Sequence, residues 1–104
     1  MNDDLAAQVR SALREVIDPE LGHNVVDLGL VYDIVVMDGV ARITMTATTR
    51  GCPAAGVLKE GVSQSASRVA GIRSVDVVMT FDPAWTPLMI EPATKALLGF
   101  RNPT

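Results

Sequence analysis

The N-terminal segment carries hydrophobic residues at the spacing of an α-helix. Asp3 and Asp4 precede them and are typical of a first helical turn, where carboxylates are stabilised by the helix dipole. Pro19 disfavours the α conformation at Asp18 and so ends the pattern. We therefore predict a helix that stops before Asp18, with its apolar face formed by Leu5, Val9, Leu13, Val16 and Ile17.

Two stretches of alternating residues follow, at 32–37 and 40–47, on either side of Asp38-Gly39. An Asp-Gly loop of two residues favours a type I′ hairpin turn, which fixes the register of the strands. One face then pairs Met37 with Val40, Val35 with Arg42 and Asp33 with Thr44. We expect the core face to be the other one, which carries Tyr32, Ile34, Val36, Ala41, Ile43 and Met45.

The pattern of residues 53–99 predicts a helix, a strand and a short helix. The helix covers 53 to about 70, with apolar positions Ala54, Val57, Leu58, Val62, Ala66 and Val69. Residues 75–81 alternate as a third strand with one buried face. The last helix begins at Pro92, or earlier at Pro87, packs through Leu97 and Leu98, and ends at Gly99. The fold class is α/β (α+β), a two-layer sandwich with helices on one face of a three-stranded mixed sheet, in the order α-β-β-α-β-α.

Topology brings three loops to one edge of this sheet. A helical crossover makes the third strand parallel to the second. The loop 18–30, the segment around Cys52 and the segment 82–85 then share one edge. Ligand sites in α/β proteins often lie beyond the carboxyl ends of strands, so this edge is the candidate site.

Composition limits the function classes. The 104 residues are 48% hydrophobic and 20% charged, which predicts one globular domain over residues 1–104. The net charge of -3 without a basic run argues against nucleic acid and membrane surfaces as partners. The acidic N-terminus does not resemble a signal peptide, and Asp27 and Asp33 interrupt the most apolar stretch. We therefore expect a cytoplasmic protein.

Cys52 is the only cysteine of the sequence. Pro53 fits the first position of the predicted helix, which makes Cys52 its N-cap. The positive end of the helix and the nearby Arg50 would stabilise the thiolate, the form that attacks electrophiles and binds metals. The alternative is a buried, inert thiol that fills a small apolar space. We favour the reactive thiol, since a structural one gains nothing from an N-cap position.

Four segments together resemble the metal-sulfur cluster assembly factor family. They are 18–22 (Asp-Pro-Glu-Leu-Gly), 25–32 (Val-Val-Asp-Leu-Gly-Leu-Val-Tyr), 46–53 (Thr-Ala-Thr-Thr-Arg-Gly-Cys-Pro) and 81–87 (Phe-Asp-Pro-Ala-Trp-Thr-Pro). The family includes SufT-like proteins, the core domain of PaaD-like proteins, a eukaryotic cytosolic iron-sulfur targeting factor and a domain fused to some ATPase cluster carriers. The resemblance implies maturation of iron-sulfur proteins, with Cys52 as the reactive cysteine and Asp18 and Glu20 as the acidic pair. It also implies a transient iron-sulfur cluster or iron, none permanently bound, with the iron-sulfur assembly machinery and apo client proteins as partners.

The other residues of these segments have both functional and local interpretations. Asp18 and Glu20 are metal ligands or proton carriers, or else ordinary turn residues. Arg50, Gly51 and Pro53 complete the cysteine motif. Hydroxyls that could support a cluster or thiolate, or serve only a strand end, belong to Thr46, Thr48 and Thr49.

Two further residues lie at the same edge. Trp85 either shields the thiolate and contacts a partner, or packs over the edge of the core. Asp27 is expected to order its own loop.

Three function classes remain open. The favoured one is a non-enzymatic assembly, carrier or targeting factor acting through Cys52. One cysteine cannot supply four cluster ligands, so a cluster must be transient or shared, for example within a homodimer. A small thiol enzyme would use Cys52 as nucleophile and Asp18 or Glu20 as base, yet no histidine stands at an interpretable spacing. An interaction adaptor would use the outer sheet face, formed by Val31, Val35, Met37, Val40 and Val78.

Overall fold

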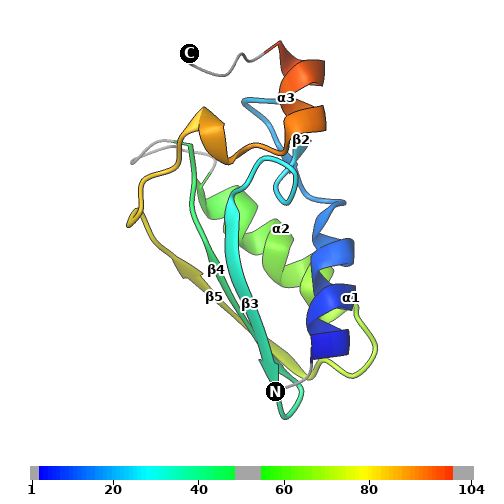
Figure 1. The fold of residues 1–104 in the computed structure, drawn as a ribbon. Helices are drawn as coiled ribbons and strands as arrows, with labels where there is room; N and C mark the ends of the chain where they lie inside the picture. Colours follow the sequence, from blue (N-terminus) through cyan, green and yellow to red (C-terminus); the bar gives the residue numbers. More distant parts are fainter. Residues whose placement is uncertain (1–2, 49–54, 100–104) are drawn as a thin grey trace.

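Two helices cover one face of a three-stranded sheet in the computed structural model, which describes residues 3–48 and 55–99 (Figure 1). The helices are α1 (Asp3–Leu13) and α2 (Ala55–Ser67), and the sheet order is β3 (Val31–Met37), β4 (Val40–Met45) and β5 (Ser74–Met79). β3 and β4 are antiparallel, whereas β4 and β5 are parallel. This arrangement confirms the predicted mixed sheet and two-layer sandwich.

The hairpin has the predicted turn and register. Asp38 has φ 51° and Gly39 has φ 77°, as a type I′ turn requires. Met37 lies opposite Val40 and Val35 opposite Arg42. A bulge between residues 31 and 33 then changes the alternation.

The bulge overturns the prediction for Val31. This residue lies opposite Met45 and is buried in the core, so it is not on the outer face. Tyr32, expected on the core face, is only partly buried. β4 also ends at Met45, and the next backbone N–H, from Thr46, donates to Leu30 O at 2.8 Å. The predicted strand at 40–47 is therefore two residues shorter.

The predicted N-terminal helix is too long. α1 ends at Leu13, and the N–H groups of residues 14–16 then bond back only three residues, which tightens the chain. Ile17 enters the short strand β1 (Ile17–Asp18), which pairs with β2 (His23–Asn24), a ladder that the pattern did not predict. Ile17 is 52% exposed and does not belong to the core.

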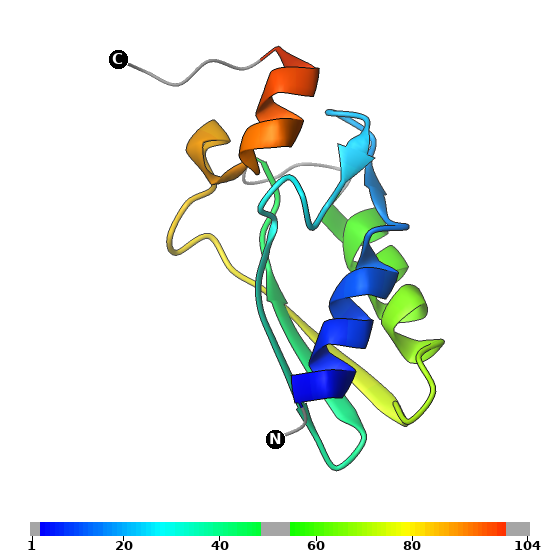
Figure 2. The same ribbon diagram turned by 45° about the vertical axis from the view of Figure 1, so that its right-hand side comes forward.

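The apolar faces of the other helices are narrower than predicted. Leu58, Val62 and Ala66 of α2 form the buried stripe, one helical turn apart. Val57 is 67% exposed, because it lies about 100° around the helix from Leu58. Leu97 is 77% exposed, because its helix lies past the strand ends and not on the sheet (Figures 1 and 2).

That C-terminal helix is α3 (Pro92–Leu98), and the predicted stop at Gly99 is confirmed by its left-handed φ of 80°. Pro87 begins a separate 3-10 helix, η1 (Pro87–Met89). η1 closes onto Gly29, where φ is 76° and any Cβ would collide with the Met89 carbonyl. Of the described helices, none is long and apolar enough to cross a membrane.

Candidate functional site

The loop 18–30, the chain just after β4 and the segment after β5 meet at one end of the sheet, which confirms the predicted meeting of the loop 18–30 with the segment 82–85; the segment around Cys52 lies outside the described residues. The loop 18–30 reaches the end of β4 through a hydrogen bond from Thr48 Oγ1 to Glu20 Oε2 (2.9 Å). The segment after β5 reaches the same loop through a hydrogen bond from Trp85 Nε1 to Leu28 O (2.7 Å). It also reaches β3, where the Tyr32 hydroxyl donates to Pro83 O (2.8 Å). The candidate site is therefore built from residues far apart in sequence.

Asp18 is the most deeply buried carboxylate that the structure describes. The β1–β2 ladder holds it opposite His23, and a turn closes when Gly22 N donates to Asp18 O (2.7 Å). Its side chain is 1% exposed, and Oδ1 accepts a long hydrogen bond from Glu20 N (3.4 Å). Oδ2 is buried and has no hydrogen-bond partner among the described residues. Burial raises the pKa of this carboxyl above its ordinary value, against the opposing hydrogen bond from the Glu20 backbone.

Glu20 lies two residues further along and has an exposed side chain. Its bond from Thr48 ties the acidic pair to the last described residue before the cysteine segment. The remaining predicted site residues, Thr49, Arg50, Gly51, Cys52 and Pro53, lie outside the described residues.

Thr46 and Tyr32 lie at the same end of the sheet and are joined by a side-chain hydrogen bond. Thr46 is fully buried, and its hydroxyl approaches Ala47 O at 3.4 Å. Burial raises the pKa of Tyr32, and a side-chain hydrogen bond with Thr46 opposes that rise. The Tyr32 hydroxyl also lies 3.5 Å from Met89 Sδ. Sequence reasoning assigned Tyr32 to the core and missed its hydroxyl, because the bulge that turns the residue has no clear sequence signal.

Trp85 packs against the hydrophobic core, and its indole N–H donates to the loop 18–30. This is the packing role considered for it.

Asp27 orders its own loop, as predicted: its carboxylate accepts from Asn24 Nδ2 (3.0 Å), and its N–H donates to Asn24 Oδ1 (2.9 Å). The hydrogen bond from Asn24 is the main cause of the lowered pKa of Asp27.

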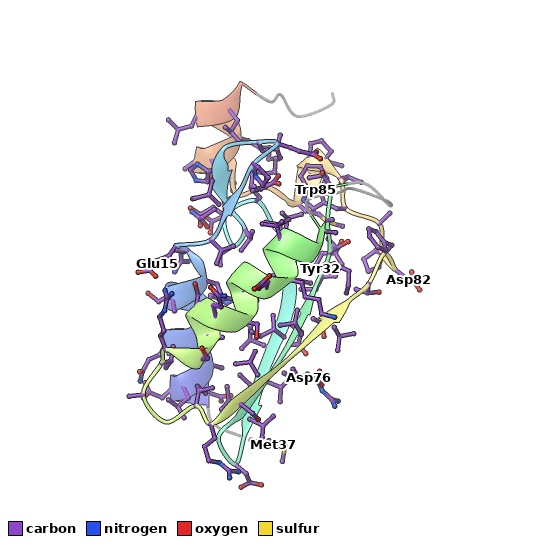
Figure 3. All side chains as sticks on the ribbon, turned by 180° about the vertical axis from the view of Figure 1, so that it is seen from behind. Glu15, Tyr32, Met37, Asp76, Asp82 and Trp85 are labelled. Carbon is purple, nitrogen blue, oxygen red and sulfur yellow. The ribbon has the colours of Figure 1, made fainter. Side chains whose placement is uncertain are left out.

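Val35 and Met37 are not part of this assembly. They lie on the sheet face away from the helices, and Met37 is 55% exposed at the hairpin end, opposite the end that holds Tyr32 and Trp85 (Figure 3). Within residues 3–48 and 55–99, no group of three or more His, Cys, Asp or Glu could hold a metal ion.

The chain belongs to a family of iron-sulfur cluster assembly proteins, because the model of the family described as "Iron-sulfur cluster assembly protein" matches residues 6–79. The Fe-S protein maturation auxiliary factor YitW of Bacillus subtilis is 35% identical over 102 residues, which cover 97% of this chain and 100% of the relative. The maturation auxiliary factor SufT of Staphylococcus aureus is 39% identical over 81% of this chain and 97% of its own.

A crystal structure of a domain of unknown function, DUF59, from Bacillus anthracis has the same fold. Its TM-score is 0.90 at 36% identity, over 95% of both chains. An iron-sulfur cluster carrier protein of Mycobacterium tuberculosis is 37% identical over 71% of this chain but only 20% of the carrier. These relatives are named as maturation factors and carriers and not as enzymes, which supports the expectation of a non-enzymatic protein.

Proposed function

We propose that this protein matures iron-sulfur proteins in the cytoplasm by binding a cluster transiently through Cys52 and passing it to apo client proteins. The observation that carries the proposal is the match to iron-sulfur assembly proteins over residues 6–79. The arrangement of Asp18, Glu20 and Thr48 around the chain that leads to Cys52 supports it.

Ligand number sets the character of this binding. Iron-sulfur clusters are commonly held by four thiolates, and this chain offers one. The other positions would go to a small thiol, to the Cys52 of a second copy, to client cysteines or to the oxygens of Asp18 and Glu20. Ligands that come from outside the chain can exchange, so such a site would release the cluster. Delivery to a client protein requires this release.

Asp18 offers a buried carboxylate that could bind iron or accept a proton, unlike a solvated turn residue. Its Oδ2 is a buried oxygen without a hydrogen-bond partner among the described residues, so it would accept a proton, or would bind iron that reaches it. A thiol must lose its proton to bind iron, and a nearby carboxylate can accept it. Asp18 would act in one of these two ways.

Anaerobic reconstitution with ferrous iron, sulfide and glutathione tests the proposal. The wild type should give less than one labile cluster per chain, visible by absorption and Mössbauer spectroscopy and transferable to an apo-ferredoxin. Cys52→Ser should lose the cluster, and Asp18→Asn should lower the yield, whereas the exposed control Asp33→Asn should not. A stable cluster in Cys52→Ser contradicts the proposal, and a wild type that binds no iron under any condition favours an adaptor instead.

A further inference from the structure

One edge of β5 is not paired with any described strand. Among the described strands β5 pairs with β4 alone. The N–H of Ser74 donates to Gly39 O and that of Thr80 to Met45 O, so the backbone groups of even-numbered residues point toward β4. Because these groups alternate along a strand, those of Val75, Val77 and Met79 point to the open edge.

This edge has little of the usual protection against strand addition. β5 is six residues long and contains no proline, and its pairing with β4 is regular along its whole length. Its one charged residue, Asp76, is oriented to the outer face, where it pairs with Arg42 at 3.4 Å. Proteins commonly guard edge strands with proline, bulges or charged side chains, and Asp76, which is paired with Arg42, is the only one of these in β5.

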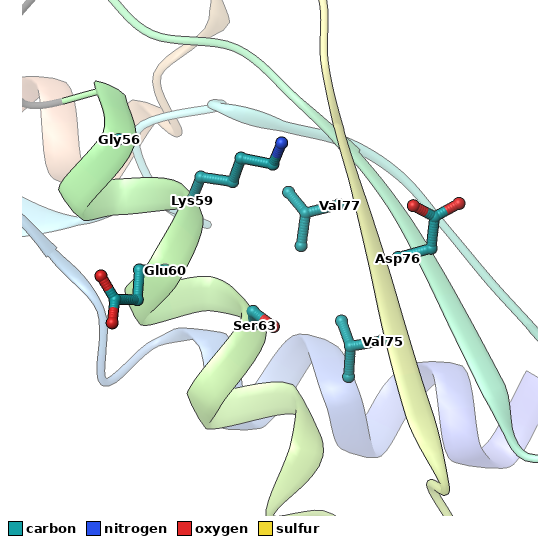
Figure 4. Close-up of a pocket in the computed structure, with 7 residues that line it drawn as sticks. All are labelled: Gly56, Lys59, Glu60, Ser63, Val75, Asp76 and Val77. Atoms are coloured by element: carbon teal, nitrogen blue, oxygen red, sulfur yellow. The ribbon is translucent and has the colours of Figure 1, made fainter.

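A groove runs beside the edge, between β5 and α2, with a volume of about 390 Å³. Val75 and Val77 form its strand side, and Gly56, Lys59 and Ser63 form its helix side (Figure 4). Lys59 extends from α2 toward Val77, whereas Glu60 points away from the strand. No atom lies within 4 Å of the position that a Cβ of Gly56 would occupy, so the groove is open beside this residue.

Charge specifies what the groove accepts. None of the ion pairs between described residues involves Lys59. Glu60 and Asp76 also line the groove, but their carboxylates point away from it, and Asp76 pairs with Arg42, so Lys59 is the charged side chain that extends toward the strand (Figure 4). A strand added beside β5 would direct every second side chain into this groove, where an acidic side chain would meet Lys59.

We propose that the edge of β5 binds an extended segment of a partner protein as a fourth strand, with an acidic side chain placed at Lys59 and β-branched neighbours over Val75 and Val77. This interaction surface does not rest on Cys52 or on cluster binding. Backbone hydrogen bonds to residues 75–79 would supply affinity, and Lys59 would supply specificity.

A second copy of the chain fits this edge less well. In a symmetric dimer, β5 of one copy would pair antiparallel with β5 of the other across a twofold axis. Only two such registers pair at least five of the six residues of β5 and also place the backbone groups at the open edges opposite each other. Centring on Asp76 places the two Asp76 side chains opposite each other, which is unfavourable. Centring on Val77 brings together the two Lys59 side chains, which extend toward that residue.

Selection from a phage-displayed library of random ten-residue peptides tests the proposal, with the full chain as target. We expect enrichment of alternating β-branched residues with one acidic residue on the groove side. The best peptide should shift the amide NMR signals of residues 74–79, and N-methylation of its backbone groups that face β5 should weaken binding at least tenfold.

Charge reversal provides the specificity test. Lys59→Glu should weaken the acidic peptide about fivefold and favour its Glu-to-Lys analogue, because an attraction becomes a repulsion. The matched control Arg68→Glu, an exposed cation after α2, should change neither affinity. Absence of enrichment, insensitivity to N-methylation, unchanged affinity in Lys59→Glu, or a wild-type dimer paired through β5 would each overturn the proposal.

Discussion

Replacement of Asp18 by asparagine should stabilise the protein at pH 8. The wild-type carboxylate is buried, and Oδ2 has no hydrogen-bond partner in the described part of the chain. An ionised group in such a place costs several kcal/mol, whereas a neutral polar atom without a partner costs about 1–3 kcal/mol. Asparagine keeps an acceptor for the Glu20 N–H and removes the charge. We expect a gain of about 1–2 kcal/mol in the free energy of unfolding.

The sign of the pH dependence follows from the raised pKa. Above that pKa the folded wild type carries the full penalty of the buried charge. As the pH falls through it toward the ordinary value of 3.8, the folded state takes up a proton and the penalty disappears. The advantage of Asp18→Asn should therefore shrink over that range. Urea unfolding of both proteins at pH 8, 6 and 4.5 measures the difference, in which other titrating groups largely cancel.

The exposed control Asp33→Asn should stay within about 0.5 kcal/mol of wild type at every pH. An Asp18→Asn protein that is less stable than wild type at pH 8, or whose advantage does not shrink as the pH falls toward 3.8, would refute the reasoning. A stability gain combined with poorer cluster reconstitution would identify Asp18 as a residue kept for function at a cost in stability.

Three further predictions concern the loops that build the site, and urea unfolding measures each. Trp85→Phe should cost about 1–2 kcal/mol, because it leaves the Leu28 carbonyl without its indole donor; an unchanged midpoint would mean that water replaces that donor. Gly29→Ala should cost at least about 2 kcal/mol, because the left-handed φ and the Met89 carbonyl both exclude a Cβ, and a cost under 0.5 kcal/mol would show that η1 moves freely. Ile17→Ser should change stability by less than about 0.5 kcal/mol, because Ile17 is exposed. A larger loss would show that Ile17 belongs to the core.

Local patterns predicted the elements whose residues interact mainly with their own neighbours. The Asp38-Gly39 turn determined the hairpin register because its two left-handed residues leave one favoured geometry. The α2 stripe and the stop at Gly99 followed from spacing and from glycine chemistry in the same way. The parallel return of β5 followed from the helical crossover between β4 and β5, and it brought the segment after β5 to the same end of the sheet as the loop 18–30.

Tertiary contacts decided the features that sequence could not predict. Ile17 continues a helical pattern, yet pairing with Asn24 draws it into β1. Asp18 belongs to the same ladder and is buried, which the sequence, with both a functional and a turn interpretation open for this residue, did not predict. Tyr32 left the predicted core face because the bulge occurs where β3 meets the loop 18–30. Each difference arises at the end of the sheet where distant segments meet.

The proposed cluster ligand Cys52 and the proposed docking groove are close in sequence. Gly56 and Lys59 line the groove, and Gly56 follows Cys52 by four residues. A chain of four residues spans at most about 14 Å. An extended partner segment bound along β5 would therefore hold cysteines near its Gly56 end within a short reach of Cys52. Docking and transfer would then use one binding event, since the partner that adds a strand also brings the missing cluster ligands.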